Sequence, residues 1–332
     1  MPKKRQSEVV VITGASAGIG RATVRAYARR GASLGLLARG QEGLDGARRE
    51  VERLGGQAVV IPTDVADPGQ VERAAGTVEK AYGPIDIWIN NAMTSVLSPV
   101  KDMTAEEFQR VTNVTYLGYV HGTLSALRRM LPRDRGVIIQ VGSALSYRAI
   151  PLQSAYCGAK HAVKGFTESL RSELIHDGSQ IRITMVHLPG VNTTQFGWIK
   201  SRLPYEPQPV PPIYQPEVMA QAIVWAGDHD RREWWVGMPT VKTIIGEKFI
   251  PGLLDHYLAE VAYKGQQTNI PINPDRADNL LSPVPQDRGA HGAFNDRARS
   301  SSFQLWASMN RGVLAVAGVG CLLLAGWAKR RL

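Results

Sequence analysis

Three side chains with the chemistry of proton transfer occur close together in this 332-residue chain: Ser143, Tyr156 and Lys160. Tyr156 and Lys160 are four positions apart, which places them on one face of a helix. A tyrosine hydroxyl has a reference pKa of about 10, and a neighbouring ammonium group lowers that pKa because it favours the phenolate. Such a pair can exchange a proton near neutral pH. The spacing alone is common by chance, so its weight comes from its place after a predicted strand that Ser143 ends.

A glycine-rich turn follows the first apolar run of the chain. Residues 13–20 read TGASAGIG, and an amphipathic stretch comes next. Glycines let the backbone approach a pyrophosphate, and the N-terminus of a helix supplies free N–H groups and positive potential. In a strand–turn–helix context the pattern indicates dinucleotide binding. The expected contacts are Gly14, Ser16, Gly18, Ile19 and Gly20.

The end of the second apolar run favours NADP(H) over NAD(H). An acidic residue there binds the ribose 2′-hydroxyl of NAD, whereas an arginine accommodates the 2′-phosphate of NADP. The run ends in Ala38-Arg39, without a carboxylate. Arg39 can offer a planar fork to a phosphate. The alternative, an ordinary solvated arginine, stays open.

The elements that position these residues alternate along the chain. Short runs rich in Val and Ile suit parallel strands buried on both faces, and amphipathic stretches between them predict helices. This alternation predicts an α/β fold, a doubly wound parallel sheet of Rossmann type in a single domain. The expected strands are 9–13, 33–38, 58–63, 85–90, 137–141, 181–187 and 233–237, and the expected helices are 21–30, 40–54, 68–82, 104–130, 155–177 and 217–227.

Residues 8 to about 245 resemble the short-chain dehydrogenases/reductases. The matching pieces are TGASAGIG at 13–20, Asp64-Val65, Asn90-Asn91-Ala92, Asn113, Ser143, YCGAK at 156–160, and Pro189-Gly190 with Thr194. The resemblance implies that Tyr156 is the catalytic acid/base and that Lys160 binds the nicotinamide ribose and lowers the tyrosine pKa. It further implies that Ser143 polarises the substrate oxygen and that Asn113 holds a water in a proton relay to Lys160.

The resemblance also implies a set of cofactor contacts. Asp64 would meet the adenine amino group with Val65 against the ring, and Asn90 and Ala92 would line the adenosine side. Pro189 and Gly190 would adjoin the cofactor, and Thr194 would reach the carboxamide.

Two positions depart from the family pattern. Met93 replaces a common glycine and puts a flexible apolar side chain near the site. Asn192 replaces a frequent aliphatic residue, which leaves open whether Thr193 or Thr194 takes the nicotinamide role.

The chain outside the resemblance is expected to divide into four parts. Residues 1–7 form a basic tail without a secretion signal, and 246–264 form a helical extension. Residues 265–305 are polar, without apolar periodicity, and predict a flexible linker. Inside the resemblance, by contrast, the proline-rich stretch 195–217 is expected to be either a lid over a site or a surface insertion. Residues 306–332 are expected to form a membrane-anchoring helix with a basic end.

The anchor prediction rests on residues 312–328, which are 17 positions without a charge. As a helix they span roughly 25 Å, at the short end for crossing a bilayer. Trp306 and Trp327 would place an aromatic at each interface. A buried core helix is the alternative. The expected location is a cytoplasmic catalytic domain attached to a membrane through its C-terminus.

Composition excludes several classes of protein. With 44% hydrophobic residues the chain is neither disordered nor fibrous, and its two cysteines, Cys157 and Cys321, are too few and too far apart for a zinc site. No metal site is expected. The net charge of +10 is attributed to an anionic cofactor and a membrane surface, since no recognition motif supports nucleic-acid binding.

We therefore expect an NADP(H)-dependent oxidoreductase that interconverts a carbonyl and an alcohol on a lipophilic small molecule, with a homo-oligomer as a plausible assembly. The alternative is a catalytically silent dinucleotide-binding sensor or scaffold at a membrane.

Overall fold

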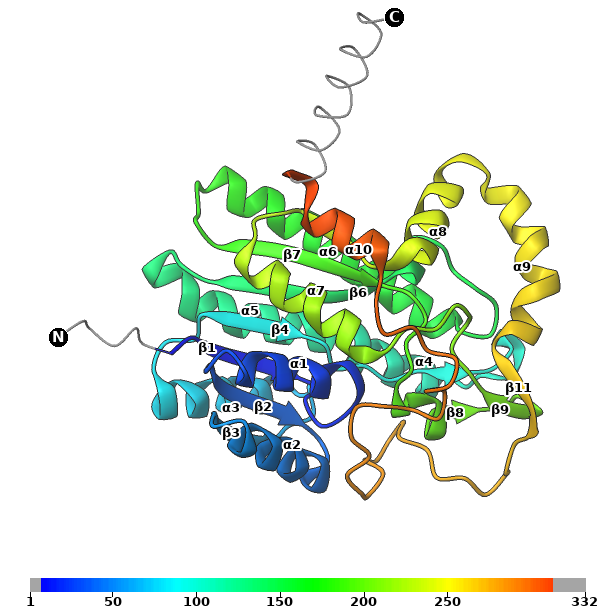
Figure 1. The fold of residues 1–332 in the computed structure, drawn as a ribbon, viewed down its shortest axis with the longest axis horizontal. Coiled ribbons are helices and arrows are strands. Elements are labelled where there is room, and N and C mark those ends of the chain that lie inside the picture. Colours follow the sequence, from blue (N-terminus) through cyan, green and yellow to red (C-terminus); the bar gives the residue numbers. More distant parts are fainter. Residues whose placement is uncertain (1–6, 313–332) are drawn as a thin grey trace, which may run out of the picture.

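The computed structural model describes residues 7–312, and its centre is a seven-stranded parallel sheet with the order β10-β7-β6-β4-β1-β2-β3 (Figure 1). The order changes direction between β1 and β4, and the crevice beyond the carboxyl ends of the strands at such a point is where open α/β sheets bind ligands. The predicted doubly wound sheet is confirmed. Its strands are β1 (Val9–Thr13), β2 (Ser33–Ala38), β3 (Gln57–Pro62), β4 (Ile87–Asn90), β6 (Val137–Ser143), β7 (Arg182–Leu188) and β10 (Glu233–Trp235).

Two helical layers bury the apolar faces of the sheet. The helices α1 (Gly18–Ala28), α2 (Gln41–Arg53) and α7 (Pro216–Asp228) pack on one face, and α3 (Pro68–Tyr82), α5 (Gly118–Met130) and α6 (Ser154–His176) pack on the other. Since both faces are covered, the central strands can be apolar along their whole length.

The stretch 104–130, expected as one helix, is interrupted. It consists of α4 (Ala105–Thr112), a π-helical turn over Asn113–Leu117, and α5. Thr104 caps α4 through a reciprocal pair of hydrogen bonds with Glu107. In the π-turn the Gly118 amide donates to the Asn113 carbonyl. Turns of this type occur frequently at functional sites.

The proline-rich stretch and the C-terminal part of the chain pack together over one end of the sheet. Here β9 (Tyr205–Pro207) pairs antiparallel with β11 (Gln267–Pro271), and β5 (Val96–Leu97) pairs with β8 (Lys200–Ser201). The helices α8 (Gly237–Phe249) and α9 (Pro251–Gly265) precede β11. The last helix of the described residues, α10 (Phe303–Met309), buries Leu305 in the core on the α1/α7 face.

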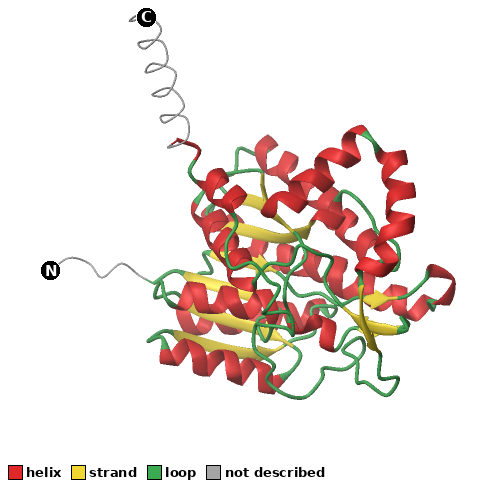
Figure 2. Cartoon of the chain, turned by 45° about the vertical axis from the view of Figure 1, so that its right-hand side comes forward, coloured by secondary structure: helices red, strands yellow, loops and turns green. Residues whose placement is uncertain are grey.

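The prediction of a flexible linker over 265–305 is wrong. Much of this segment has no regular secondary structure, as its green trace in Figure 2 shows, yet it is packed onto the domain. Leu280, Ala290 and Phe294 are buried. The buried side chain of Asn192 accepts a hydrogen bond from the Phe294 amide and donates one to the Asn295 side chain. Side chains of the domain thus form hydrogen bonds with backbone groups of the segment that are not paired in a helix or a sheet. The segment therefore needs no apolar periodicity, and its composition resembles that of a linker.

The predicted anchor falls mostly beyond the described chain. Residues 303–309 form α10, and the apolar run from residue 313 onward lies outside the described residues. Within 7–312, no helix combines the length and the apolarity that a bilayer crossing requires.

Candidate active site

A cavity of about 890 Å³ lies at the carboxyl ends of the strands, where a ligand is expected. It begins at the glycine-rich turn, passes Ser143 and Tyr156, and ends against α9. The proline-rich stretch covers part of it through Gln195, Phe196, Trp198 and residues 208–211. These lining residues favour a position over the site for that stretch, and its role as a lid stays a prediction.

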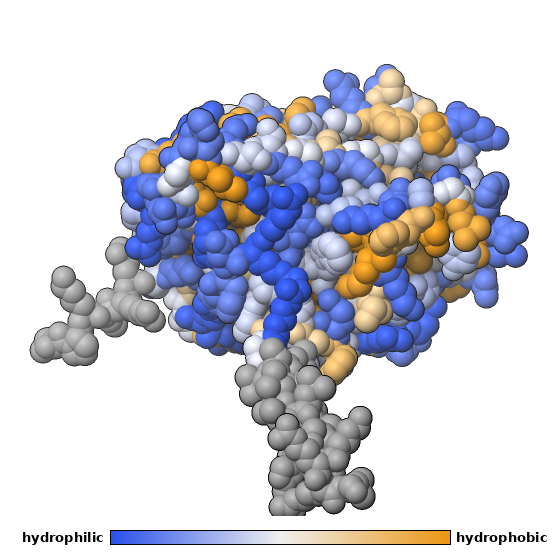
Figure 3. Space-filling model, turned by 90° about the horizontal axis from the view of Figure 1, so that it is seen from above, coloured by the Kyte–Doolittle hydropathy of each residue, from blue (hydrophilic) through white to orange (hydrophobic). Residues whose placement is uncertain are grey.

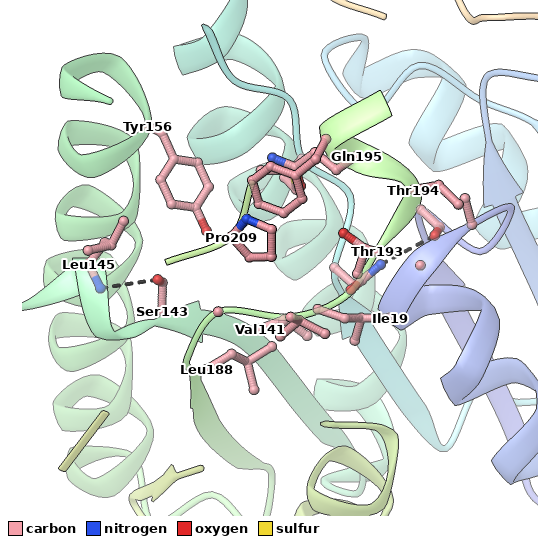
Figure 4. Close-up of a pocket in the computed structure, with 18 of the residues that line it drawn as sticks. Ile19, Val141, Ser143, Leu145, Tyr156, Leu188, Thr193, Thr194, Gln195 and Pro209 are labelled. Carbon is pink, nitrogen blue, oxygen red and sulfur yellow. Dashed lines mark hydrogen bonds between the residues drawn. The ribbon is translucent and has the colours of Figure 1, made fainter. Parts of the chain in front are cut away.

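Ser143 is the last residue of β6, and its hydroxyl accepts a hydrogen bond of 3.1 Å from the Leu145 amide (Figure 4). The hydroxyl oxygen is therefore held in place while its proton remains available for donation. The Tyr156 hydroxyl points toward this serine from α6. The two hydroxyl groups thus face one small part of the cavity, as the sequence predicts.

Burial raises the pKa of Tyr156, and hydrogen bonding with Ser143 partly opposes the rise. The phenol is therefore protonated at neutral pH in the cofactor-free protein. A protonated phenol beside a serine hydroxyl can donate a proton to a substrate oxygen.

Lys160 lies one helical turn beyond Tyr156 and is almost completely buried. Its ammonium donates to the Tyr119 hydroxyl at 2.9 Å and to the Val141 carbonyl at 2.8 Å. Burial lowers the pKa of Lys160 to about 7. Its Nζ lies 5.7 Å from the centroid of the Tyr156 ring, close enough for its charge to act on the phenol.

Replacement of Lys160 by methionine should change the pH dependence of stability. The unfolded chain binds the lysine proton up to about pH 10.5, whereas the folded chain releases it near pH 7. Between these values the unfolded state holds more protons, so the free energy of unfolding of the wild type rises with pH. At pH 6 the folded wild type carries the full cost of a buried charge. We expect Lys160→Met without cofactor to melt higher than wild type at pH 6, with the gap narrowing toward pH 10. Melting curves from pH 6 to 10 would contradict this if the gap were constant.

Asn113 opens the π-helical turn and is half-buried. Its side chain forms no hydrogen bond with any residue of 7–312. The Lys160 ammonium instead donates directly to the Tyr119 hydroxyl. The proposed water relay from Asn113 stays a prediction.

The glycine-rich turn has the shape that a dinucleotide needs. Gly14 and Gly18 adopt positive φ angles of 66° and 56°, which favour glycine. A Cβ on Gly20 would lie 2.1 Å from the Gly14 carbonyl oxygen, so the third glycine lets the helix approach the first. Gly14, Ser16, Gly18 and Ile19 line the cavity, while Gly20 supports the turn from behind.

Besides the glycine-rich turn, Thr194 is a second feature of the cavity that fits a bound ligand. It lines the cavity, is 8% exposed, and its hydroxyl has no hydrogen-bond partner among the described residues. Thr193 instead packs its methyl group against Gly18. Buried hydroxyl groups are normally satisfied, so the open position favours Thr194 as the residue that meets a ligand. Pro189 and Gly190 line the same wall. The residues present therefore fit a nicotinamide dinucleotide.

The adenosine side of the cavity differs from the sequence expectation at Arg39. Its guanidinium donates to the carbonyls of Asn279, Leu280 and Leu281, and burial together with Arg110 lowers its pKa. In this structure the Arg39 guanidinium therefore binds the C-terminal segment, whereas we expected it to be free to bind a phosphate. Asp64 and Val65 do line the cavity, as does Ala92, and Asp64 forms an ion pair of 2.6 Å with Arg110.

Asn90 does not reach the cavity, contrary to expectation. Its amide donates to Thr123 and Gln140 and accepts from Trp88, all inside the layer under α5. Trp88 and Asn90 are two apart in β4 and therefore point to the same face. The neighbouring Asn91 lines the cavity instead, and its side-chain amide donates hydrogen bonds to the carbonyls of Thr13 and Gly14.

Three features of the site lack a signal in the sequence. Tyr119 is an unremarkable helical tyrosine until the fold brings it to Lys160. His187 is fully buried in β7, its Nδ1 lies 3.1 Å from the Ser143 carbonyl, and burial lowers its pKa to about 4. The third is the segment from Asn279 to Arg288, which lines the cavity from a part of the chain read as linker. In the described part of the chain, no group of three or more His, Cys, Asp or Glu residues is placed to hold a metal ion.

Comparisons with known proteins agree with this geometry. The protein-family model described as "short chain dehydrogenase" matches residues 8–202 of this chain. The "Uncharacterized oxidoreductase YxnA" of Bacillus subtilis (strain 168) is 32% identical over 330 residues, 99% of this chain and 92% of the relative. The "Dehydrogenase/reductase SDR family member 7" of Homo sapiens is 36% identical over 170 residues, 50% of each chain.

A solved structure shares the fold. It is described as "X-ray structure alcohol dehydrogenase from archaeon Thermococcus sibiricus complexed with 5-hydroxy-NADP", with a TM-score of 0.60, 27% identity, and coverage of 69% of this chain and 96% of that one. The catalytic geometry, the family match and the nearly full-length relative lead to one conclusion: this chain is an oxidoreductase of the short-chain dehydrogenase/reductase family.

Proposed function

We propose that the protein interconverts a carbonyl and an alcohol of a lipophilic small molecule with NADP(H) as its cofactor. The observation that carries the proposal is the convergence of Ser143, Tyr156 and Lys160 on a cavity that is continuous with the glycine-rich turn. A nicotinamide cofactor bound there supplies or accepts the hydride.

The side chains of the site divide the proton chemistry between them. In the reductive direction the Ser143 hydroxyl donates a hydrogen bond to the carbonyl oxygen, and the Tyr156 hydroxyl gives that oxygen its proton. The Lys160 ammonium stabilises the tyrosinate that remains, because an opposite charge favours the ionised form. Oxidation of an alcohol uses the same groups in reverse.

The preference for NADP(H) is supported by positive charge on the adenosine side. Arg39 and Arg110 lie together there, and the solved neighbour carries an NADP analogue by its own description. We propose that Arg39 exchanges one of its carbonyl contacts for the 2′-phosphate.

The lipophilic substrate is supported by the far end of the cavity. Leu254, Leu258 and Val261 of α9 line it, and Phe249 and Leu253 beside them are 79% and 66% exposed. Figure 3 shows apolar residues gathered on the right of the view from above, the side on which Figure 1 places α8 and α9.

A panel of ketones and aldehydes of increasing alkyl length, assayed with NADPH and with NADH, tests the proposal. We expect reduction with NADPH to exceed that with NADH, and kcat/KM to rise with chain length. Arg39→Ala should lower kcat/KM for NADPH by a clearly larger factor than kcat/KM for NADH, because both cofactors lose the contact of Arg39 with residues 279–281 and only NADPH also loses a phosphate contact. Turnover of small hydrophilic carbonyls alone would contradict the lipophilic assignment, and equal use of both cofactors would contradict the preference.

We further propose that the C-terminus attaches a cytoplasmic enzyme to a membrane. A truncation for this test should follow Arg311, because Leu305 belongs to the core. If the full chain and the truncated chain fractionate alike, the attachment is wrong.

A further inference from the structure

The C-terminal segment 279–295 crosses the cofactor cavity and is fastened on both sides of it. At its beginning, Arg39 and Arg110 donate to carbonyls of residues 279–281. At its end, Asn192 holds Phe294 and Asn295. The part between these anchors lines the cavity through Pro283, Val284, Pro285, Gln286 and Arg288. The orange trace in Figure 1 shows the segment passing the end of α1.

Between the anchors, the segment touches the glycine-rich turn itself. The Gly18 amide donates to the Gly289 carbonyl at 3.1 Å. The buried side chain of Arg21 forms a two-pronged contact of 3.0 and 3.1 Å with the Asp287 carboxylate. A planar fork of this kind fixes orientation as well as distance. Residue 288 is therefore held beside the N-terminus of α1.

Within the described part of the chain, no carboxylate is paired with Arg288. Arg288 is exposed and lines the cavity, and its guanidinium carbon lies 5.5 Å from the centroid of the Trp198 ring. Among residues 7–312 its side chain forms neither a hydrogen bond nor an ion pair. The nearest carboxylate in sequence, that of Asp287, is occupied by Arg21. An arginine held beside the N-terminus of a helix can share with it a bound anion, because both present positive potential. Thr194, whose buried hydroxyl has no hydrogen-bond partner among the described residues, lines the same cavity further along, toward the nicotinamide end.

We propose that Arg288 binds the pyrophosphate of the dinucleotide, so that the phosphates are held between the glycine-rich turn and the C-terminal segment. The assignment rests on the proposed function, because it takes the ligand to be a dinucleotide. It adds a phosphate ligand from a part of the chain outside the region that the family model matches.

Binding measurements on the full chain test this assignment without relying on turnover. Titration calorimetry would compare wild type with Arg288→Gln for three probes: NADPH, ADP and adenosine 2′-monophosphate. ADP carries the pyrophosphate, whereas adenosine 2′-monophosphate carries only the phosphate expected near Arg39. We expect Arg288→Gln to raise Kd for NADPH and ADP roughly ten-fold, the size of a lost charge-assisted hydrogen bond. Kd for adenosine 2′-monophosphate should stay within about two-fold of wild type.

Arg135→Gln is the matched control. Arg135 is exposed, lies just before β6 at the amino ends of the strands, opposite the carboxyl ends where the cavity lies, and has no side-chain partner in the described chain. The substitution Arg135→Gln removes the same charge as Arg288→Gln and should leave the Kd values for all three probes unchanged. Arg288→Lys should retain part of the ADP affinity, and melting curves confirm that each variant folds.

Two results would overturn the assignment: an unchanged Kd for ADP in Arg288→Gln, or an equal loss for adenosine 2′-monophosphate. A wild type that binds none of the three probes would instead refute the proposed function, and the assignment with it.

Discussion

Tyr156→Phe should lose nearly all carbonyl-dependent oxidation of NADPH while still binding the cofactor. The substitution removes the proton donor and leaves the ring in its place between Ser143 and α6. General acid catalysis contributes roughly a hundred- to ten-thousand-fold, and kcat should fall by a factor in that range. Stopped-flow measurement of NADPH absorbance gives the rate, and calorimetry gives Kd, which should stay within about two-fold of wild type.

This variant also separates the enzyme from a silent dinucleotide-binding scaffold. For a scaffold, wild type and Tyr156→Phe would bind NADPH equally and neither would turn over any carbonyl. Cys157→Ser is a suitable control for local disturbance, because Cys157 is the next residue along α6 and its thiol is buried. If Tyr156→Phe kept more than a tenth of wild-type kcat, another group would be the proton donor.

Gly20→Ala should disable the cofactor turn. The added Cβ would lie 2.1 Å from the Gly14 carbonyl oxygen and 2.7 Å from Asn91 Nδ2, both too close for real contacts. Either α1 or the turn must move. Overpacking of this kind costs about 1–3 kcal/mol of stability. A displacement near 1 Å at the site costs roughly a hundred-fold in kcat/KM.

Gly165→Ala provides the matched control. Gly165 lies in α6 with nothing within 4 Å of an added Cβ, so the same change should stabilise the helix by about 0.5–1 kcal/mol. Chemical denaturation measures both free energies of unfolding, and titration with NADPH follows binding. Wild-type affinity in Gly20→Ala would show that the turn tolerates the shift and that its tight approach is not required.

The parts of the molecule that repeat a local pattern could be predicted from sequence. The Val- and Ile-rich runs predict the strands correctly because a parallel strand buried on both faces must be apolar throughout. Ser143, Tyr156 and Lys160 could be placed together because β6 ends at the serine and α6 starts near the tyrosine.

Where contacts come from distant parts of the chain, the sequence misled us or was silent. Asn90 was expected at the cofactor, but the alternation in β4 turns it toward α5, a direction that only the register fixes. The segment 279–295 lacks apolar periodicity because its backbone is satisfied by side chains of Arg39, Arg110 and Asn192. Such bonds leave no periodic trace in composition.

The contact between Gly18 and Gly289 has a consequence for the order in which the enzyme is made. The glycine-rich turn is synthesised well before its partner, because Gly289 lies 271 positions after Gly18 (289 minus 18). A nascent chain can form the central sheet long before residue 289 is synthesised, yet its cofactor cavity still lacks a wall at that stage. Completion of the cavity therefore waits for the synthesis of residue 289.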